Sequence, residues 1–277
     1  MPRTIEADAI AKVLIREYER GLTRAYKVLP FANRKYEGNI ANIWDSVIIP
    51  YLTIGDWNDS TDPNRDIPES DLEIKTHKLV VNQYKDIRIK LSDKEVSLLW
   101  ADIKTTQEIV RQMKEKAQII QENYFVSKLL SVSNTVDSPV ALTAANIYSE
   151  IVRMQVEMDK KNVPEDDRQL FVSPLIAWIL LDSRKIEAFP DGYKPVSTGE
   201  MGMLAWFTIV KTNALFWANE KKMLWHQGKA GAFVEKINKI KIMESPTGNY
   251  HNLIGWLFFD ADVIGENKKK VLIYEGA

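Results

Sequence analysis

A serine between an apolar run and a following helix is the first candidate for chemistry in this sequence. In FVSPLIAWILLD, Ser173 follows Phe171 and Val172 and precedes Pro174. Some hydrolases present a nucleophilic serine at such a corner, but small residues flank that serine, and the N–H of the next residue stabilises the oxyanion. Pro174 has no N–H, and proline suits the first position of a helix behind a serine N-cap. We therefore expect Ser173 to cap a helix over 174–182.

Histidines and paired carboxylates are the remaining candidates for catalysis or metal binding. The histidines are His77, His226 and His251, without metal-ligand spacing, and we expect each at a surface or an interface. The acidic pairs are Asp62/Asp66, Asp166-Asp167 and Asp260/Asp262, and carboxylates in turns are ordinarily solvated. The chain has no cysteine, which excludes disulfides and thiolate chemistry. We predict no catalytic residue, no cofactor and no metal site; a metal-independent hydrolase using Asp166 or Ser173 is the distant alternative.

Two further clusters have residue types that bind ligands. The run Lys268-Lys269-Lys270 has the charge to contact phosphates, but a short lysine run at a turn is usually a solvated face. Aromatic residues gather at Trp206, Phe207, Phe216, Trp217 and Trp225, and again at Trp256, Phe258 and Phe259. In segments this apolar, aromatics usually form the core or a subunit interface. Neither cluster predicts an active site.

The composition is that of a globular protein. The chain has 277 residues, of which 45% are hydrophobic, enough for one large domain or two modest ones. Its net charge of -1 produces no global field that would attract nucleic acid or an anionic membrane. Charges of both signs interrupt the N-terminal segment, so we expect no signal peptide, and no apolar run approaches the roughly 20 residues that span a bilayer.

The first half of the chain predicts an arm, a projecting loop and a long helix. Residues 5–28 have the spacing of an amphipathic helix or arm, with Arg16, Arg20 and Arg24 on its polar side. Strands are expected over 47–52, 72–76 and 83–91, and the polar stretch 55–71 reads as a projecting loop that grips a partner. The capping box Ser92-Asp-Lys-Glu95 then begins a helix to about Val132, roughly 35–40 residues and about 55 Å long.

The second half mixes helices and strands without regular alternation. Helices are expected over 142–160, 174–182 and 229–241. Strands are expected over 169–172 and 203–215, and the apolar segments NLIGWLFFDADVI and KKKVLIYE supply two closing strands. This order predicts an α+β fold.

The order of these elements, together with two short motifs, resembles the major capsid proteins of tailed bacteriophages with the Hong Kong 97-type fold. The residues that match are Val163, Pro164, Arg168, Phe171, Val172 and Pro174 in the first motif, and Gly199, Gly202, Val210, Thr212 and Asn213 in the second. The segment RKYEGNIANIWDSVIIP is similar to the family's approach to its extended loop. Trp44 stands where the family commonly has glycine, and Asp167 replaces the glycine before the arginine.

The resemblance implies a division of the chain into five parts. These are an N-terminal arm (1–29), an extended β-hairpin loop (30–80), a peripheral domain with the spine helix (81–138), an axial domain (139–265) and a C-terminal strand returning to the peripheral domain (266–277). The arm and the loop would clasp adjacent subunits. The candidate contact residues are Arg16, Arg20 and Arg24 in the arm and Tyr51, Trp57 and Arg65 in the loop.

The function implied is that of a non-enzymatic shell subunit that self-assembles into hexamers and pentamers. The expected product is an icosahedral head around double-stranded DNA, assembled in the host cytoplasm and retained in the virion. Expected partners are the chain itself, separate scaffolding, portal and decoration proteins, and packaged DNA through weak, non-specific contact, with no membrane. The nearer alternative is an encapsulin-like shell of a cellular compartment, because one fold supports several functions.

Overall fold

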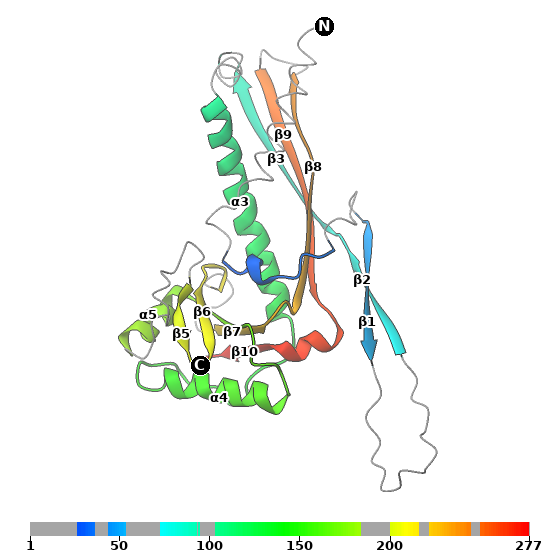
Figure 1. Ribbon diagram of the computed structural model, residues 1–277. Coiled ribbons are helices and arrows are strands. Elements are labelled where there is room, and N and C mark those ends of the chain that lie inside the picture. The colour runs from blue at the N-terminus through cyan, green and yellow to red at the C-terminus, as the bar shows by residue number, and fades with distance from the viewer. Residues whose placement is uncertain are drawn as a thin grey trace.

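The computed structural model describes residues 27–36, 44–53, 73–92, 94, 103–183, 200–215, 222–244 and 250–276. Figure 1 shows three parts: a long helix lying along a three-stranded sheet (the spine region), a smaller region of short helices around a five-stranded sheet (the compact region), and a two-stranded ribbon beside them (the ribbon). Helices and strands are mixed, as the α+β prediction requires.

The described elements have the following bounds. The helices are η1 (Leu29–Phe31), α3 (Ile103–Leu130), α4 (Ile147–Lys160), α5 (Pro174–Asp182) and η3 (Gly265–Lys270). The strands are β1 (Ser46–Thr53), β2 (Glu73–Val80), β3 (Gln83–Ser92), β4 (Arg168–Val172), β5 (Glu200–Leu204), β6 (Phe207–Lys211), β7 (Lys222–Gln227), β8 (Gly231–Glu244), β9 (Tyr250–Val263) and β10 (Val271–Glu275).

The spine region joins α3 to the antiparallel sheet β3-β9-β8. Aromatic side chains hold the helix on the sheet: the rings of Phe125 and Phe233 lie 6.0 Å apart and those of Tyr124 and Phe259 lie 5.4 Å apart, both pairs edge to face. The described helix has 28 residues, which is about 42 Å at 1.5 Å per residue. The expected long helix is present, while Glu95 of the predicted capping box lies outside the described residues and Ser92 ends β3.

The compact region is a five-stranded sheet buried on both faces. Its strand order is β10-β7-β4-β6-β5, with β4 parallel to β6 and the other pairs antiparallel. Leu170 and Val172 of β4 pack with residues of α4 and α5 in one core, while Phe171 joins α3 and β8 residues in another. All five residues of β4 are therefore buried. Successive side chains of a strand point to opposite faces of the sheet, so β4 lies between two cores.

The ribbon pairs β1 with β2 from Ser46↔Val80 to Thr53↔Glu73. One face of its root is buried: Val47, Ile49 and Leu79 pack with residues of β8 and β9. The three strands expected in this part of the chain are confirmed, and β2 extends beyond its predicted end at residue 76.

Three elements differ from the sequence-based expectation. Residues 229–241, expected as a helix, belong mainly to β8, which pairs with β9 along most of its length. A register shift between Ile237 and Lys239 breaks the two-residue alternation, so that apolar residues recur at helix-like spacing.

The strand expected over 203–215 is a hairpin instead. Strands β5 and β6 are joined by Ala205 and Trp206, whose φ angles of 48° and 68° give a two-residue turn. Such turns usually contain asparagine or glycine, so the sequence carries no signal for this one.

Helix α4 begins at Ile147, five residues later than expected. The side chain of Asn146 accepts from the Thr143 N–H at 2.7 Å and donates to the Ala141 carbonyl at 2.8 Å. Side-chain bonds of this kind compete with helix formation, which explains the late start.

Trp44 and Asp167, the two residues that depart from the family's glycines, both have left-handed backbones, with φ angles of 71° and 54°. Glycine adopts this conformation without strain, whereas residues with a Cβ are disfavoured there. Glycine would therefore adopt the backbone conformation of both positions without strain.

Two strand pairings connect segments that the predicted domain ranges separate. Strands β8 and β9, inside the range given to the axial domain, form one sheet with β3. Strand β10, expected to return to the peripheral domain, pairs with β7 in the sheet of the compact region. Among the described residues of 81–138, Thr135 forms an isolated β-bridge with Ile273 of β10.

Candidate functional site

The corner at Ser173 is a helix cap, as the sequence predicts. Strand β4 ends at Val172, and α5 begins at Pro174. The Ser173 Oγ accepts a hydrogen bond from the Ile176 N–H at 3.3 Å, and the residue is fully buried. A buried serine whose oxygen caps a helix offers no nucleophile to a substrate.

His226 lies in the core, which corrects the expectation of a surface or interface histidine. It is 1% exposed on β7. Its Nδ1 lies 3.2 Å from the Gln169 Oε1, and its Nε2 accepts from the Gly231 N–H at 3.3 Å. This pattern fixes the neutral ring with its proton on Nδ1. Burial, assisted by the nearby charge of Lys270, lowers the pKa of His226 to about 3, so the ring is structural at neutral pH.

Asp260 is also buried, contrary to the expectation that it is solvated. It is 2% exposed and accepts hydrogen bonds from the Tyr124 hydroxyl at 2.7 Å and from the Asn82 N–H at 3.1 Å. Its neighbour Asp262 lies 2.9 Å from the Nε2 of His77. These contacts connect β9 with α3, β2 and the start of β3. Asp260 therefore connects these elements through hydrogen bonds. Asp166 and Asp167, by contrast, are exposed.

Glu122 was not singled out by the sequence, yet it joins three parts of the chain. This buried residue of α3 accepts from the Thr212 hydroxyl at 2.6 Å and from the Lys27 N–H at 2.7 Å. Desolvation raises the pKa of the carboxyl, against the effect of these hydrogen bonds. No apolar stripe singles it out in the sequence, because α3 also buries Lys114, Gln118 and Gln121.

Arg168, a residue of the capsid motif, is a buried anchor. Its guanidinium donates to the Asp159 carboxylate at 2.8 Å, to the Pro164 carbonyl at 2.8 Å and to the Val163 carbonyl at 2.5 Å. The side chain is 1% exposed. It holds the turn after α4 against the start of β4, which is a structural role.

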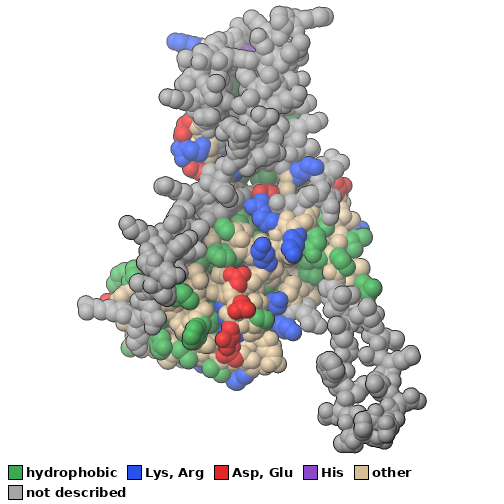
Figure 2. All heavy atoms as spheres, viewed as in Figure 1, with side chains coloured by type: hydrophobic (Ala, Val, Ile, Leu, Met, Phe, Trp, Pro, Cys, Tyr) green, Lys and Arg blue, Asp and Glu red, His purple; other side chains and the backbone are tan. Residues whose placement is uncertain are grey.

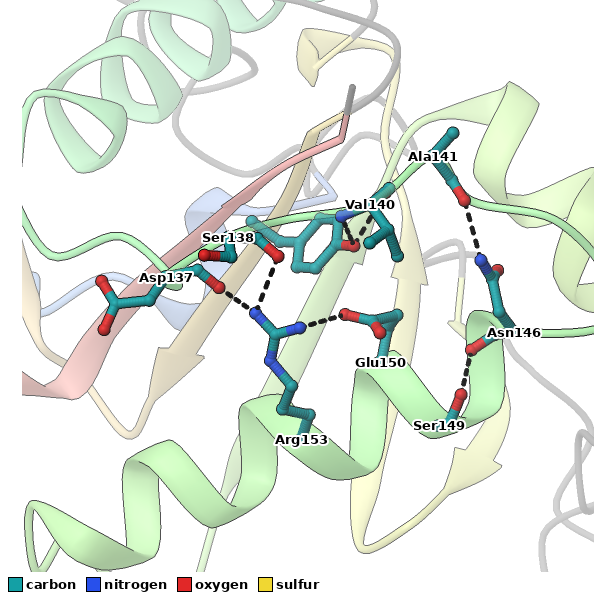
Figure 3. Close-up of polar contacts among 9 residues, drawn as sticks. Asp137, Ser138, Val140, Ala141, Asn146, Ser149, Glu150 and Arg153 are labelled. Carbon is teal, nitrogen blue, oxygen red and sulfur yellow. Dashed lines mark hydrogen bonds and ion pairs between the residues drawn. The ribbon is translucent and has the colours of Figure 1, made fainter.

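A network of polar contacts fixes the segment before α4 (Figure 3). Arg153 of α4 donates to the carbonyls of Asp137 and Ser138 and to the Glu150 carboxylate. The Tyr274 hydroxyl donates to the Val140 carbonyl at 2.8 Å and accepts from the Val140 N–H at 2.8 Å. This segment is consequently attached to both α4 and β10. No chemistry other than positioning follows from these contacts.

The described residues contain no group of three or more histidine, aspartate or glutamate side chains placed to hold a metal ion. Among the described helices, none has the length and apolar character needed to cross a membrane.

The six predicted contact residues fall almost entirely outside the described residues. Arg16, Arg20, Arg24, Trp57 and Arg65 lie outside them. Of Tyr51 the structure gives only the backbone, which pairs with Lys75 in the ribbon. Their role in subunit contacts remains a prediction.

Exposed apolar side chains mark two other surfaces. On the ribbon, Ile48 and Ile74 are 63% and 64% exposed, on the face opposite the buried Val47 and Ile49. Large apolar side chains at such exposure usually mark binding surfaces when several occur together. We call this surface the ribbon face.

The second surface is on the compact region. Leu175, Trp178 and Leu181 of α5 point outward at 41%, 64% and 58% exposure, while Ile176, Ala177 and Leu180 face the core. We call the three outward residues the α5 face. Figure 2 shows hydrophobic side chains gathered over this part of the molecule. The segment PLIAWILL has no polar face, and a helix apolar all round is expected to be covered on every side.

Comparison with known proteins gives a clear result only at the level of structure. No family model matches the sequence, and no curated protein matches it. A solved chain of Mycobacterium phage Che8 matches with a TM-score of 0.68 and 17% identity, covering 89% of this chain and 90% of that one. The capsid structure of cyanophage P-SCSP1u matches with a TM-score of 0.63 and 14% identity over 86% and 85% of the two chains.

A third similar structure is a virus-like particle from Pyrococcus furiosus. It matches with a TM-score of 0.56 and 12% identity, covering 98% of this chain and 99% of that one. At such identities the likeness shows a shared fold, and the coverage shows that this fold includes most of the chain. The chain therefore has the fold of phage capsid proteins, as the resemblance to the Hong Kong 97-type family predicted.

Proposed function

We propose that this protein is the major shell subunit of a tailed-phage head. Copies would form hexamers and pentamers and close into an icosahedral shell around double-stranded DNA. The observation that carries the proposal is the match to phage capsid structures across most of both chains. A match of that extent covers the whole subunit architecture and not one shared motif.

The two apolar surfaces support the proposal independently of the comparisons. The ribbon face and the α5 face belong to different parts of the molecule (Figure 1). A subunit that joins a closed shell needs contacts on more than one side, because every copy has several neighbours. Two separate exposed apolar surfaces are what such a subunit requires.

The roles of the predicted segments follow from this proposal. The arm (1–29) and the extended loop (30–80) clasp neighbouring subunits, with the ribbon face as part of that contact. The α5 face meets other copies around the capsomer axis. Separate scaffolding, portal and decoration proteins complete the assembly in the host cytoplasm.

A second candidate function is the shell of a cellular compartment. The observation in its favour is the Pyrococcus furiosus virus-like particle, whose chain and this one match over nearly their full lengths. The contents of purified particles distinguish the candidates. DNA inside, tails in micrographs or a neighbouring terminase gene support the phage head, whereas enclosed enzymes support the compartment.

Assembly is tested by sedimentation of the purified chain, alone and with a scaffolding partner, followed by electron microscopy. We expect capsomer rings or closed shells. Trp178→Asp should abolish these species by placing a charge in the α5 face while the monomer stays folded. Thr143→Asp is the matched control, because it adds the same charge at another exposed position of the compact region. A wild-type chain that stays monomeric under all conditions contradicts the proposal. Equal assembly of the two variants contradicts the role of the α5 face.

A further inference from the structure

Three buried polar atoms of the compact region have no hydrogen-bond partner within the part of the chain that the structure describes. They are the Nη1 of Arg168, the Nε1 of Trp225 and the Oε1 of Gln227. The three residues are 3%, 1% and 7% exposed. A polar atom that leaves water without gaining a partner destabilises the folded state, so atoms of this kind call for a bound water or ion.

The three side chains leave the same face of the five-stranded sheet. In the antiparallel pairing of β4 with β7, Arg168 lies opposite Gln227, and Leu170 lies opposite Trp225. Residues two apart on a strand share a face, and so do paired residues on neighbouring strands. Phe207 of β6 packs beside two of the three: its ring centroid lies 3.9 Å from that of Trp225 and 5.9 Å from the Arg168 Cζ. The unpaired atoms therefore belong to neighbouring side chains on the side of the sheet that α4 and α5 cover.

The guanidinium of Arg168 has two N–H groups left for a ligand. Its Nε donates to the Pro164 carbonyl at 2.8 Å, and its Nη2 donates to the Asp159 carboxylate at 2.8 Å and to the Val163 carbonyl at 2.5 Å. A guanidinium has five N–H groups in one plane, so these three bonds leave the two on Nη1. The same three bonds fix the plane of the group and thereby the direction in which Nη1 donates.

The amide of Gln227 presents an acceptor beside these donors. Its Nε2 donates to the Asp166 carbonyl at 2.9 Å. The opposite orientation of the amide would set its oxygen against that carbonyl, so this hydrogen bond determines that the oxygen is the atom left over. The indole of Trp225 can only donate. Together the three side chains offer donors from two residues and an acceptor from the third.

We propose that one buried water molecule binds between Arg168, Trp225 and Gln227, at a position that we call the water site. The water accepts hydrogen bonds from the Arg168 Nη1 and the Trp225 Nε1 and donates one to the Gln227 Oε1. Buried waters typically make about three hydrogen bonds to groups that otherwise lack partners. An anion would face the Gln227 oxygen, and a metal cation would face the charge of Arg168, so neither suits this set of groups.

The water site joins the turn after α4 to β7 and completes the contacts of the Arg168 anchor. It is independent of the proposed function, because it lies inside one subunit.

The first test is a crystal structure of the unassembled, full-length chain at a resolution that shows ordered water. We expect one density peak within about 2.7–3.2 Å of all three atoms. A direct hydrogen bond between the Arg168 Nη1 and the Gln227 Oε1, or no peak within reach of all three atoms, overturns the proposal. Crystals soaked in bromide identify an anion, and anomalous scattering at the peak would also overturn it.

Two variants test the role of the acceptor. Gln227→Met removes the amide oxygen at similar side-chain volume and should abolish the peak. Gln169→Met is the matched control, because Gln169 is a buried glutamine of β4, 2% exposed, whose side chain leaves the opposite face of the sheet. It should keep the peak. A peak that is unchanged in Gln227→Met contradicts the proposed site.

Nuclear magnetic resonance of the same unassembled chain, labelled with ¹⁵N in its eight tryptophans, gives an independent test in solution. Trp225→Phe identifies the indole signal of Trp225. We expect a nuclear Overhauser effect from water to this indole proton in the wild type and in Gln169→Met, and its loss in Gln227→Met. A wild-type indole without the effect overturns the proposal even if neither variant folds, and it leaves the shell function untouched.

Discussion

Acidification should destabilise the subunit through His226. The neutral ring donates through Nδ1 to Gln169 and accepts from the Gly231 N–H through Nε2. A second proton would place an N–H on Nε2 against the N–H of Gly231 and put a charge in the core. Burial, and after it the nearby charge of Lys270, lowers the pKa of His226 from 6.5 to about 3, so between these values the unfolded chain binds a proton that the folded chain does not.

The size of the effect follows from proton linkage. Because the folded-state pKa is the lower one, the stabilisation is fully present above pH 6.5 and is lost as the pH falls toward 3. At pH 4.5 the loss is about 2.7 kcal/mol, and below pH 3 it approaches about 5 kcal/mol, at 1.36 kcal/mol per pKa unit. Glu122 acts in the opposite direction, since its raised pKa makes folding more favourable at low pH.

Denaturant unfolding of the unassembled chain between about pH 4.5 and pH 7.5 measures this loss. In His226→Gln the amide oxygen can accept from the Gly231 N–H, but the packing against Phe171, whose ring centroid is 5.9 Å away, is reduced. We expect the variant to be about 1–2 kcal/mol less stable at neutral pH and to lose about 2.7 kcal/mol less than the wild type on acidification. Because the other titrating groups are the same in both proteins, the difference between the two pH profiles measures the contribution of His226. Parallel pH profiles of the two proteins would refute the reasoning.

Three further substitutions test the packing and the backbone. Gly231→Ala would place a Cβ 2.7 Å from the Phe125 Cε2, so the free energy of unfolding should fall by about 1–3 kcal/mol. Calorimetry should show a smaller loss when the same substitution is made in a Phe125→Leu background. Equal losses in the two backgrounds would argue against a clash with the Phe125 ring. Trp44→Gly should raise the stability by about 0.5–1 kcal/mol because it relieves a left-handed φ of 71°, whereas a decrease in the melting temperature would show that the exposed indole contributes more. Arg168→Met leaves the carbonyls of Val163 and Pro164 without their donor; urea unfolding should show a loss of about 2–4 kcal/mol, and a loss within error of zero would contradict the anchor role.

The sequence was sufficient to predict secondary structure wherever neighbouring residues determine the backbone conformation. The β4-Ser173-α5 junction is the clearest case, because a serine cap, a proline at the first helical position and an apolar run on each side all act within a few residues. The same holds for the strands near residues 47–52 and 83–91 and for the closing strands β9 and β10. The family resemblance depended on this segment as well.

The long-range contacts could not be derived in the same way. Residues 231–244 have helix-like spacing because of a bulge, and they become a strand because β9 provides an edge to pair with. The turn at Ala205 and Trp206 contains none of the usual turn residues, and only the pairing of β5 with β6 imposes it. In both places hydrogen bonds to the partner strand outweigh local preference.

The sequence by itself determined the α+β composition, the long helix, the capped serine corner and the resemblance to capsid proteins, since each is encoded in residue types a few positions apart. The tertiary structure alone decided what surrounds each polar side chain. His226, Glu122 and Asp260 look like ordinary surface residues in the sequence, and the fold buries them. The reason is that burial depends on which elements pack above a residue, and the spacing of residues along the chain does not specify that packing.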